Sequence, residues 1–213
     1  MKISILLPYK ENFSSNYAGA VSLFVKDTVK NSKYKNNTYV YGNTDYKNKL
    51  LKNYVNLNLN KTFYQSGSKL YVESFLKHEN KKPSNLIEIH NRPNYVKFLK
   101  DRTDAKLTLF FHNDPLSMNG SKTISDRIYL IKNIDQLIFN STWSKNRFFI
   151  GMKDFYISPN KISIAYQSAS KAKINLNKKQ NIISFVGKLN KAKGYDLFGA
   201  AVVRILNKYP KWK

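Results

Sequence analysis

The sequence contains no cysteine among its 213 residues. This absence excludes disulfides and cysteine-ligated metals, and it fits a reducing compartment. No apolar run approaches the roughly 18 residues that a membrane-spanning helix requires. The apolar core of the opening MKISILLPYK is too short for a signal peptide and is expected to be a buried first strand. The sequence therefore predicts a cytoplasmic protein.

Acidic residues are scarce: 13 Asp and Glu stand against 37 Lys and Arg, which gives a formal net charge of +24. Only five of the basic residues are Arg, and the lysines are spread along the chain. Nucleic-acid-binding proteins more often carry Arg-rich or clustered patches, so the pattern argues against a nucleic-acid partner. A peripheral contact with the anionic inner face of a membrane is favoured instead, because each nearby lysine contributes about 1 kcal/mol.

Short apolar runs alternate with helical patterns along the whole chain, which is typical of an α/β fold with a mainly parallel sheet. The runs are apolar at nearly every position, as expected for strands that are buried on both faces. Eight strands are predicted, at Ile3–Pro8, Thr38–Gly42, Tyr54–Leu59, Leu86–His90, Leu107–His112, Gln136–Asn140, Ile162–Tyr166 and Ile182–Val186.

Helical segments are predicted between these strands. In the first, apolar residues from Tyr17 to Val29 follow the i, i+3, i+4, i+7 spacing of one helix face. Ser141 or Thr142 is suited to be the N-cap of the fifth helix. The remaining helices are predicted at Lys69–Glu79, Asn94–Arg102, Thr123–Asn133, Thr142–Met152 and Lys193–Tyr209.

A polar, lysine-rich stretch without periodicity suggests a domain boundary. Residues 168–180 are expected to be an interdomain linker, and residues 1–167 before it are expected to form a complete Rossmann-like domain. Residues 181–213 hold one predicted strand and one predicted helix, which is too little chain to fold unaided. This last part is therefore expected to be the truncated start of a second Rossmann-like domain.

The stretch from Ile183 to Phe198 predicts a strand, a tight turn and a helix N-terminus. The apolar run stops at Gly187, and Lys188 and Lys193 place two cations at the turn. Helix N–H groups and lysines that converge at such a turn can bind a phosphate. A solvated turn in a lysine-rich protein is the alternative, but the spacing and the strand–turn–helix context favour anion binding.

Three predicted strands carry polar residues beyond their carboxyl ends, where open parallel sheets bind ligands. Gly19 begins the first helix and lets a phosphate or sugar approach the backbone closely, although close helix–strand packing also requires Gly. His90 and His112 each stand at the end of a predicted strand, and the two strands are expected to be neighbours. A lone strand-end His is more often structural, whereas two at equivalent ends favour a site. His90, His112 and Asp114 could ligate a metal, but neither a close His pair nor a Cys supports this, so no metal site is predicted.

Several segments resemble family 4 glycosyltransferases. The turn reads G-K-L-x-x-x-K-G and resembles the G-R-L-x-x-x-K-G that opens the second domain of that family. LTLFFHNDP is similar to the segment in which a strand ends in His at the catalytic cleft, and LIEIHNRP to the strand before it. The chain has Ala18-Gly19 where the family usually has Gly-Gly, and Gln167-Ser168-Ala169 where it usually has Asn-Gly-Val.

This resemblance implies a GT-B fold, in which two Rossmann-like domains face a cleft. It also implies sugar transfer from a nucleotide-sugar to a glycan or lipid-linked acceptor, with retained anomeric configuration and without a metal or cofactor. The acidic motif of the second domain would lie beyond Lys213, so this chain is expected to be an inactive fragment. The implied site residues are His112 as catalytic, Gly187, Lys188 and Lys193 at the donor diphosphate, and Gly19 and His90 at the acceptor loop.

Two other functions remain open. A different nucleotide-binding α/β protein, such as an epimerase or a flavodoxin-like protein, would be expected to carry a Gly-rich first turn, and the sequence has none. A basic polyanion-binding module is the third possibility. The dispersed lysines and the well-patterned sheet argue against it.

Overall fold

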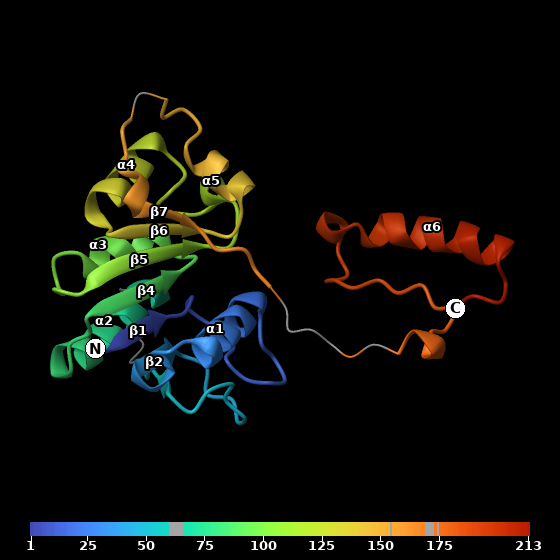
Figure 1. Cartoon of the computed structure of the whole chain (residues 1–213), viewed down its shortest axis with the longest axis horizontal. Helices are drawn as coiled ribbons and strands as arrows, with labels where there is room; N and C mark the ends of the chain where they lie inside the picture. Colours follow the sequence, from blue (N-terminus) through green and yellow to red (C-terminus); the bar gives the residue numbers. More distant parts are fainter. Residues whose placement is uncertain (60–65, 154, 169–172, 174) are drawn as a thin grey trace. The chain divides into compact units, whose positions relative to one another are not determined.

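The computed structural model describes residues 1–59, 66–153, 155–168, 173 and 175–213 (Figure 1). The chain divides into two compact units, Met1–Ser168 and Ala169–Lys213. Each unit is described by itself. The linker predicted at 168–180 lies partly outside the described residues.

A seven-stranded sheet forms the centre of the first unit, and every pair of neighbouring strands is parallel. The strand order is β3-β2-β1-β4-β5-β6-β7, so the direction of winding reverses between β1 and β4. The carboxyl ends of β1 and β4 therefore flank the position where open α/β sheets bind ligands. The strands are β1 (Ile3–Leu6), β2 (Thr38–Gly42), β3 (Tyr54–Asn56), β4 (Leu86–His90), β5 (Lys106–Phe111), β6 (Gln136–Phe139) and β7 (Ile162–Ile164).

Helices pack on both faces of this sheet. One face packs against α1 (Ala20–Asn31), whose buried residues Val21, Val25 and Val29 form a cluster with Ile3 and Ile5 of β1. The opposite face carries the larger core, to which the other helices contribute (Figure 1). Those helices are α2 (Gly67–Lys81), α3 (Val96–Leu99), α4 (Ile124–Asn133) and α5 (Thr142–Phe148).

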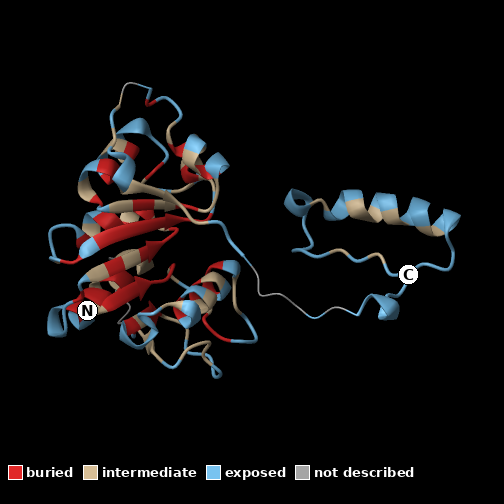
Figure 2. Ribbon diagram, viewed as in Figure 1, coloured by how far each residue is buried: buried red, intermediate tan, exposed pale blue. Residues whose placement is uncertain are grey.

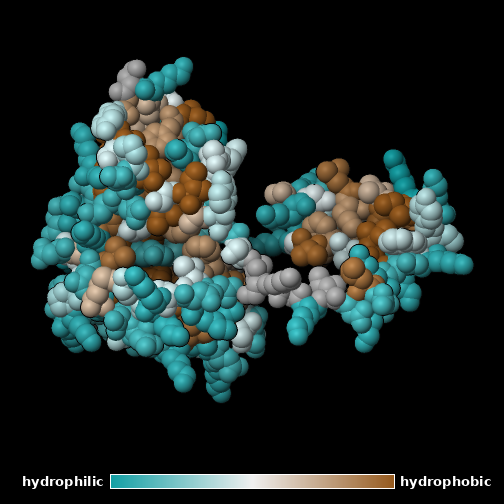
Figure 3. Space-filling view, in the orientation of Figure 1, coloured by the Kyte–Doolittle hydropathy of each residue, from teal (hydrophilic) through white to brown (hydrophobic). Residues whose placement is uncertain are grey.

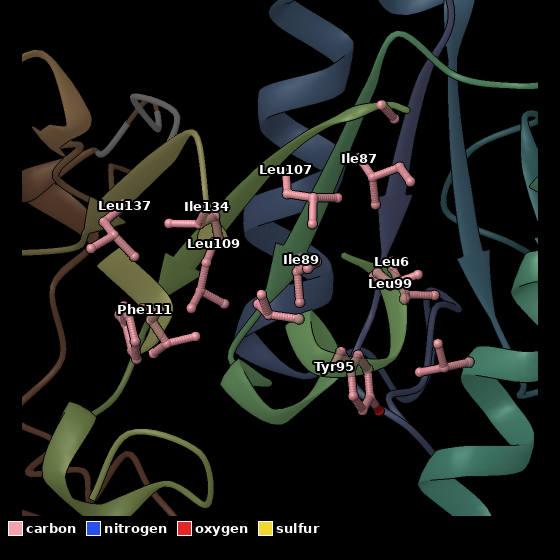
Figure 4. Packing of buried hydrophobic residues seen from close by; sticks show 14 of the residues in the cluster. Leu6, Ile87, Ile89, Tyr95, Leu99, Leu107, Leu109, Phe111, Ile134 and Leu137 are labelled. Carbon is pink, nitrogen blue, oxygen red and sulfur yellow. The ribbon is translucent and has the colours of Figure 1, made fainter. Parts of the chain in front are cut away.

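The central strands contribute alternate residues to the larger core. Ile87 and Ile89 of β4 pack with Leu107, Leu109 and Phe111 of β5 (Figure 4). Most residues of the central strands β1, β2, β4 and β5 are buried (Figure 2). Because side chains alternate along a strand, the intervening residues point to the face that α1 covers. Those residues include Glu88 and His90 of β4 and Phe110 of β5.

The α/β fold with a parallel sheet is confirmed, and seven of the eight predicted strands are present in the described chain. Of the two N-cap candidates for α5, Ser141 is the N-cap, because its side chain accepts a hydrogen bond from the backbone N–H of Ser144. The predicted helix at Asn94–Arg102 is instead a 3₁₀ turn, Pro93–Tyr95, followed by the single turn of α3. No helix in the described residues is long and apolar enough to cross a membrane.

The second unit contains a 3₁₀ turn at Lys191–Lys193 and the helix α6 (Tyr195–Lys208). The strand predicted at Ile182–Val186 is wrong, because these residues form no strand. A parallel strand needs neighbours to accept its backbone hydrogen bonds. Among the described residues, this segment donates backbone hydrogen bonds only near its start, from Ile182 N–H to Gln180 O (2.8 Å) and from Ile183 N–H to Lys213 O (2.7 Å).

Apolar side chains remain exposed throughout the described part of the second unit. Phe185 packs against Phe198 of α6 with ring centroids 5.4 Å apart. Val186, however, is 93% exposed, and Leu189 and Leu197 are also exposed. Hydrophobic residues accordingly appear on the surface of this unit (Figure 3). The apolar side of α6 therefore lacks the burial that stabilises a helix in a folded domain.

Candidate functional site

A cavity of about 390 Å³ lies at the carboxyl edge of the sheet in the first unit. Its walls come from the segments that follow β1, β4, β5 and β7, together with the start of α1. The cavity therefore occupies the edge and the switch point at which open α/β sheets bind ligands. Its lining residues are Pro8, Glu11, Ala20, Val21, Asn91, Arg92, His112, Asn113 and Gln167.

The N-terminus of α1 is occupied by a carboxylate of the protein itself. Glu11 Oε1 accepts hydrogen bonds from the backbone N–H of Ser22 (3.3 Å) and from its hydroxyl (3.1 Å). A Cβ atom on Gly19 would collide with this carboxylate. Gly19 thus makes room for Glu11, and a phosphate approaching this helix end would meet a negative charge.

Four side chains form a continuous hydrogen-bonded array that ends at the cavity. Glu88 Oε1 lies 2.6 Å from His90 Nε2, and His90 Nδ1 lies 2.8 Å from His112 Nε2. The remaining nitrogen of His112, Nδ1, lies 2.8 Å from Gln167 Nε2. Two residues that sequence analysis placed at strand ends are therefore in direct contact.

Aromatic rings enclose this array. Phe110 stacks on His112 with centroids 4.5 Å apart, and Phe24 of α1 meets His112 edge-on at 5.0 Å. His90 is 0% exposed and His112 is 9% exposed. Burial, and then the neighbouring His90, lower the pKa of His112 from 6.5 to about 3. His112 is therefore neutral at physiological pH.

The loop after β4 is held in an uncommon backbone conformation that supports His112. Asn91 has a φ of 56°, in the left-handed region that few non-glycine residues adopt. Its side-chain Oδ1 accepts hydrogen bonds from the backbone N–H groups of His112 (3.1 Å) and Asn113 (3.3 Å). Asn140 Nδ2 donates to His112 O (2.8 Å). The backbone around His112 is thus fixed from β4 and from β6.

A larger cavity, of about 760 Å³, lies at the opposite, amino edge of the sheet. Its most deeply buried charged group is Glu79, whose carboxylate accepts from the Ser84 hydroxyl (2.9 Å) and pairs with Lys2 Nζ (3.4 Å). These partners already satisfy the carboxylate. The carboxyl-edge cavity is the better candidate, because residues after four strands converge there.

The second unit contains the three residues predicted to bind a diphosphate. A Cβ atom on Gly187 would lie 3.8 Å from Lys193 Cβ, so these two residues are adjacent. Asn190 Oδ1 accepts from the backbone N–H of Lys193 (3.1 Å) and shapes the turn before α6. Lys188 and Lys193 are exposed, and Asp196 lies in the first turn of α6. The turn therefore offers cations, with one carboxylate nearby.

The predicted residues differ in their access to the carboxyl-edge cavity. His112 lines it, whereas the fully buried His90 reaches it only through His112. Gly19 does not line the cavity, but it lies against Glu11 and precedes Ala20, which both do. Glu11, Asn91 and Gln167 were not among the predicted site residues. Within the described residues, no three His, Cys, Asp or Glu side chains are grouped so that they could hold a metal.

Comparison with solved structures finds similarity in fold. The crystal structure of Anabaena Alr3699/HepE in complex with UDP and glucose matches at a TM-score of 0.53 and 14% identity, covering 78% of this chain and 44% of that one. Acinetobacter baumannii MurG matches at 0.45 and 9%, covering 85% and 49%. The chain thus spans less than half the length of either structure. No family model matches the sequence, and no curated protein does.

The low pKa of His112 predicts a specific loss of stability in acid. The unfolded chain binds a proton at this residue below about pH 6.5, whereas the folded protein does not until about pH 3. The contribution of His112 to the free energy of unfolding is therefore largely retained above pH 6.5. It falls as the pH is lowered, by about 2 kcal/mol at pH 5. Urea unfolding at pH 7.5 and at pH 5 measures this difference.

Two variants isolate this contribution. His112→Gln is expected to reduce the stability difference between pH 7.5 and pH 5 by about 2 kcal/mol. His78→Gln changes an exposed histidine of α2 and is the matched control with which the change in His112→Gln is compared. If the free energy of unfolding depended equally on pH in the wild type and in His112→Gln, the low pKa assigned to His112 would be contradicted.

Proposed function

We propose that this chain is the acceptor-side domain, with the start of the sugar-donor domain, of a GT-B glycosyltransferase that uses a nucleotide-sugar. The observation that carries the proposal is the convergence of His112 with polar side chains at the switch point of the parallel sheet. Alr3699/HepE, which shares this fold, was crystallised with UDP and glucose. UDP and glucose are the two parts of a nucleotide-sugar.

The chemistry of the cavity suits a neutral sugar. Glu11 and the neutral His112 present hydrogen-bond acceptors, and Asn91, Asn113 and Gln167 present amides. Arg92 supplies the one cation among the lining residues in the described chain. A hydroxyl-bearing ligand can satisfy such groups without placing a negative charge against Glu11.

The turn of the second unit would contribute the diphosphate site. Lys188 and Lys193 each offer a charge-assisted hydrogen bond, and their charge would stabilise the leaving nucleoside diphosphate. We further propose, on the resemblance to family 4, that the acceptor is a glycan or a lipid-linked glycan and that the anomeric configuration is retained. His112 is the proposed catalytic residue of the first domain.

A chain that continues through a complete second domain is expected to bind a nucleoside diphosphate. Isothermal titration with UDP, ADP and GDP would identify the nucleotide. Incubation of the matching sugar nucleotides with candidate acceptors would then detect transfer. The 213-residue chain is the control and should bind at least about tenfold more weakly, since its single turn would provide only part of the contacts. Failure of all three nucleotides to bind would contradict the proposed function.

We also propose a peripheral contact with anionic membranes, based on the net charge of +24. Hydrophilic residues dominate the visible face of the first unit (Figure 3). The chain is expected to sediment with phosphatidylglycerol vesicles but not with phosphatidylcholine vesicles. Salt at about 1 M, where the Debye length is about 3 Å, should release it. Equal sedimentation with both vesicles would contradict the proposal.

A further inference from the structure

The order of donors and acceptors in the Glu88–His90–His112–Gln167 array determines where the ring protons lie. An ionised carboxylate can only accept, so the 2.6 Å contact requires a proton on His90 Nε2. With one proton on each ring, His90 Nδ1 is then an acceptor. His112 Nε2 must donate to it across 2.8 Å. His112 Nδ1 is left with a lone pair, which accepts from Gln167 Nε2.

The surroundings favour this arrangement over a charged one. A second proton on His112 would place an imidazolium among the rings of Phe24 and Phe110, where desolvation disfavours charge. The charged groups that face the array are Glu88 from β4 itself and, across the cavity, Glu11 and Arg92. Helix α1 faces it with Phe24, and the segment after β7 faces it with the neutral Gln167.

We propose that Glu88 and His90 are positioning residues that hold His112 as its Nε2–H tautomer, so that Nδ1 offers a lone pair to a ligand hydroxyl. Gln167 Nε2 occupies this position in the structure and is the group that a ligand displaces. The part that concerns the ligand rests on the proposed function. The part that concerns the tautomer rests only on the array.

This arrangement selects the class of ligand at the inner end of the cavity. A lone pair accepts from a hydroxyl or an amine, but it repels the oxygens of a phosphate or a carboxylate. The carboxylate of Glu11, at the start of α1, likewise repels a phosphate or a carboxylate. The cavity is therefore assigned to the neutral, polyhydroxylated part of a substrate, and a phosphate is excluded from contact with His112.

Histidine ring ¹⁵N spectra of the labelled 213-residue chain test the tautomer directly. The chain has three His, so single variants assign every signal. At pH 7.5 the wild type is expected to show His112 protonated only on Nε2. In Glu88→Gln the amide can donate as well as accept, so the array can reverse, and His112 should populate both tautomers to comparable extents. Glu73→Gln, which removes a carboxylate paired with Arg102, is the matched control and should leave His112 unchanged.

A second variant keeps the test decisive if Glu88→Gln does not fold. Gln167→Ala removes the last member of the array and should retain the Nε2–H tautomer, because Glu88 fixes it from the other end. A switch to Nδ1–H in this variant would overturn the proposal. A doubly protonated His90 in the wild type, or an unchanged tautomer in folded Glu88→Gln, would overturn it equally.

Glucose and inorganic phosphate test the ligand class in the same spectra. Excess glucose is expected to shift the His112 Nδ1 resonance, and to shift it further in Gln167→Ala, where the position is vacated. Phosphate is expected to leave it in place. A response to phosphate alone, or to neither probe, would overturn the assignment of the cavity to a hydroxyl-bearing ligand. None of these measurements requires nucleotide binding or sugar transfer, so their failure is distinguishable from failure of the proposed function.

Discussion

Replacing Phe111 by Ala is expected to lower the free energy of unfolding of the first unit by about 3–5 kcal/mol. Phe111 is fully buried, and its ring centroid lies 5.3 Å from that of Phe139 and 5.5 Å from that of Phe148. The three rings join β5, β6 and α5. Truncation would leave a cavity that neighbouring strands cannot close, because their positions are fixed by backbone hydrogen bonds.

Urea unfolding followed by near-ultraviolet circular dichroism measures this effect. The midpoint should fall while the slope of free energy against urea stays the same, since the folded state exposes no additional surface. Tyr156→Ala, at a residue that is 84% exposed, is the matched aromatic control and should change stability by less than about 0.5 kcal/mol. Equal losses in the two variants would show that the Phe111 cluster is not the core.

The sheet could be predicted from the sequence because its strands are buried on both faces. Runs such as Ile5–Leu7 and Leu109–Phe111 are apolar at successive positions, and the helices between the strands have their own period. Their parallel pairing follows from the alternation of strands and helices. The same reasoning placed His90 and His112 at one edge of the sheet. In the structure, His90 Nδ1 lies 2.8 Å from His112 Nε2.

The prediction of a strand at Ile182–Val186 was wrong for a physical reason. Its apolar run is as strong as those of the first unit, but a run makes a strand only when neighbouring strands accept its hydrogen bonds. Within the described part of the second unit, Ile183 has only the chain end at Lys213 as a partner. The apolar run therefore indicated that the segment could form a strand if neighbouring strands were present, but not that it does so here.

The other cavity residues could not be predicted because their roles depend on long-range contacts. Gln167 reaches His112 across 55 positions of sequence. Glu11 lies in a polar loop, where a carboxylate is ordinarily solvated, and only the fold brings it to the backbone of Ser22. A glycine that precedes a helix, as Gly19 does, predicts close approach of another group. It does not indicate whether that group is a ligand or a side chain of the protein.

The two units differ in charge at the places where the proposed function requires different ligands to bind. The cavity of the first unit presents Glu11 and a neutral His112, which suit sugar hydroxyls. The turn before α6 presents lysines on an exposed surface, which suits a diphosphate. Because Asp196 lies in the first turn of α6, the helix end alone is a weak anion site. In the proposed function, Lys188 and Lys193 would therefore supply most of the attraction for a diphosphate.

Replacing Lys188 and Lys193 together by Ala is expected to weaken binding of a nucleoside diphosphate by about 3 kcal/mol or more, roughly a hundredfold, in a chain that continues through a complete second domain. Each lysine would lose one charge-assisted hydrogen bond to a phosphate oxygen. The fold should stay intact, because both side chains are exposed and neither makes an ion pair with any described residue.

The control for this variant removes the same charge from the same unit. Lys178 and Lys179 are also exposed, but they lie outside the G-K-L-x-x-x-K-G turn. Their replacement by Ala should therefore change affinity by less than about threefold, through long-range attraction alone. Titration calorimetry at two salt concentrations separates this screened attraction from direct contact, since only the turn variant should lose affinity that persists at high salt. Equal affinities of the turn variant and the wild type would refute the diphosphate assignment of Lys188 and Lys193, while leaving the cavity around His112 to be tested by its own variants.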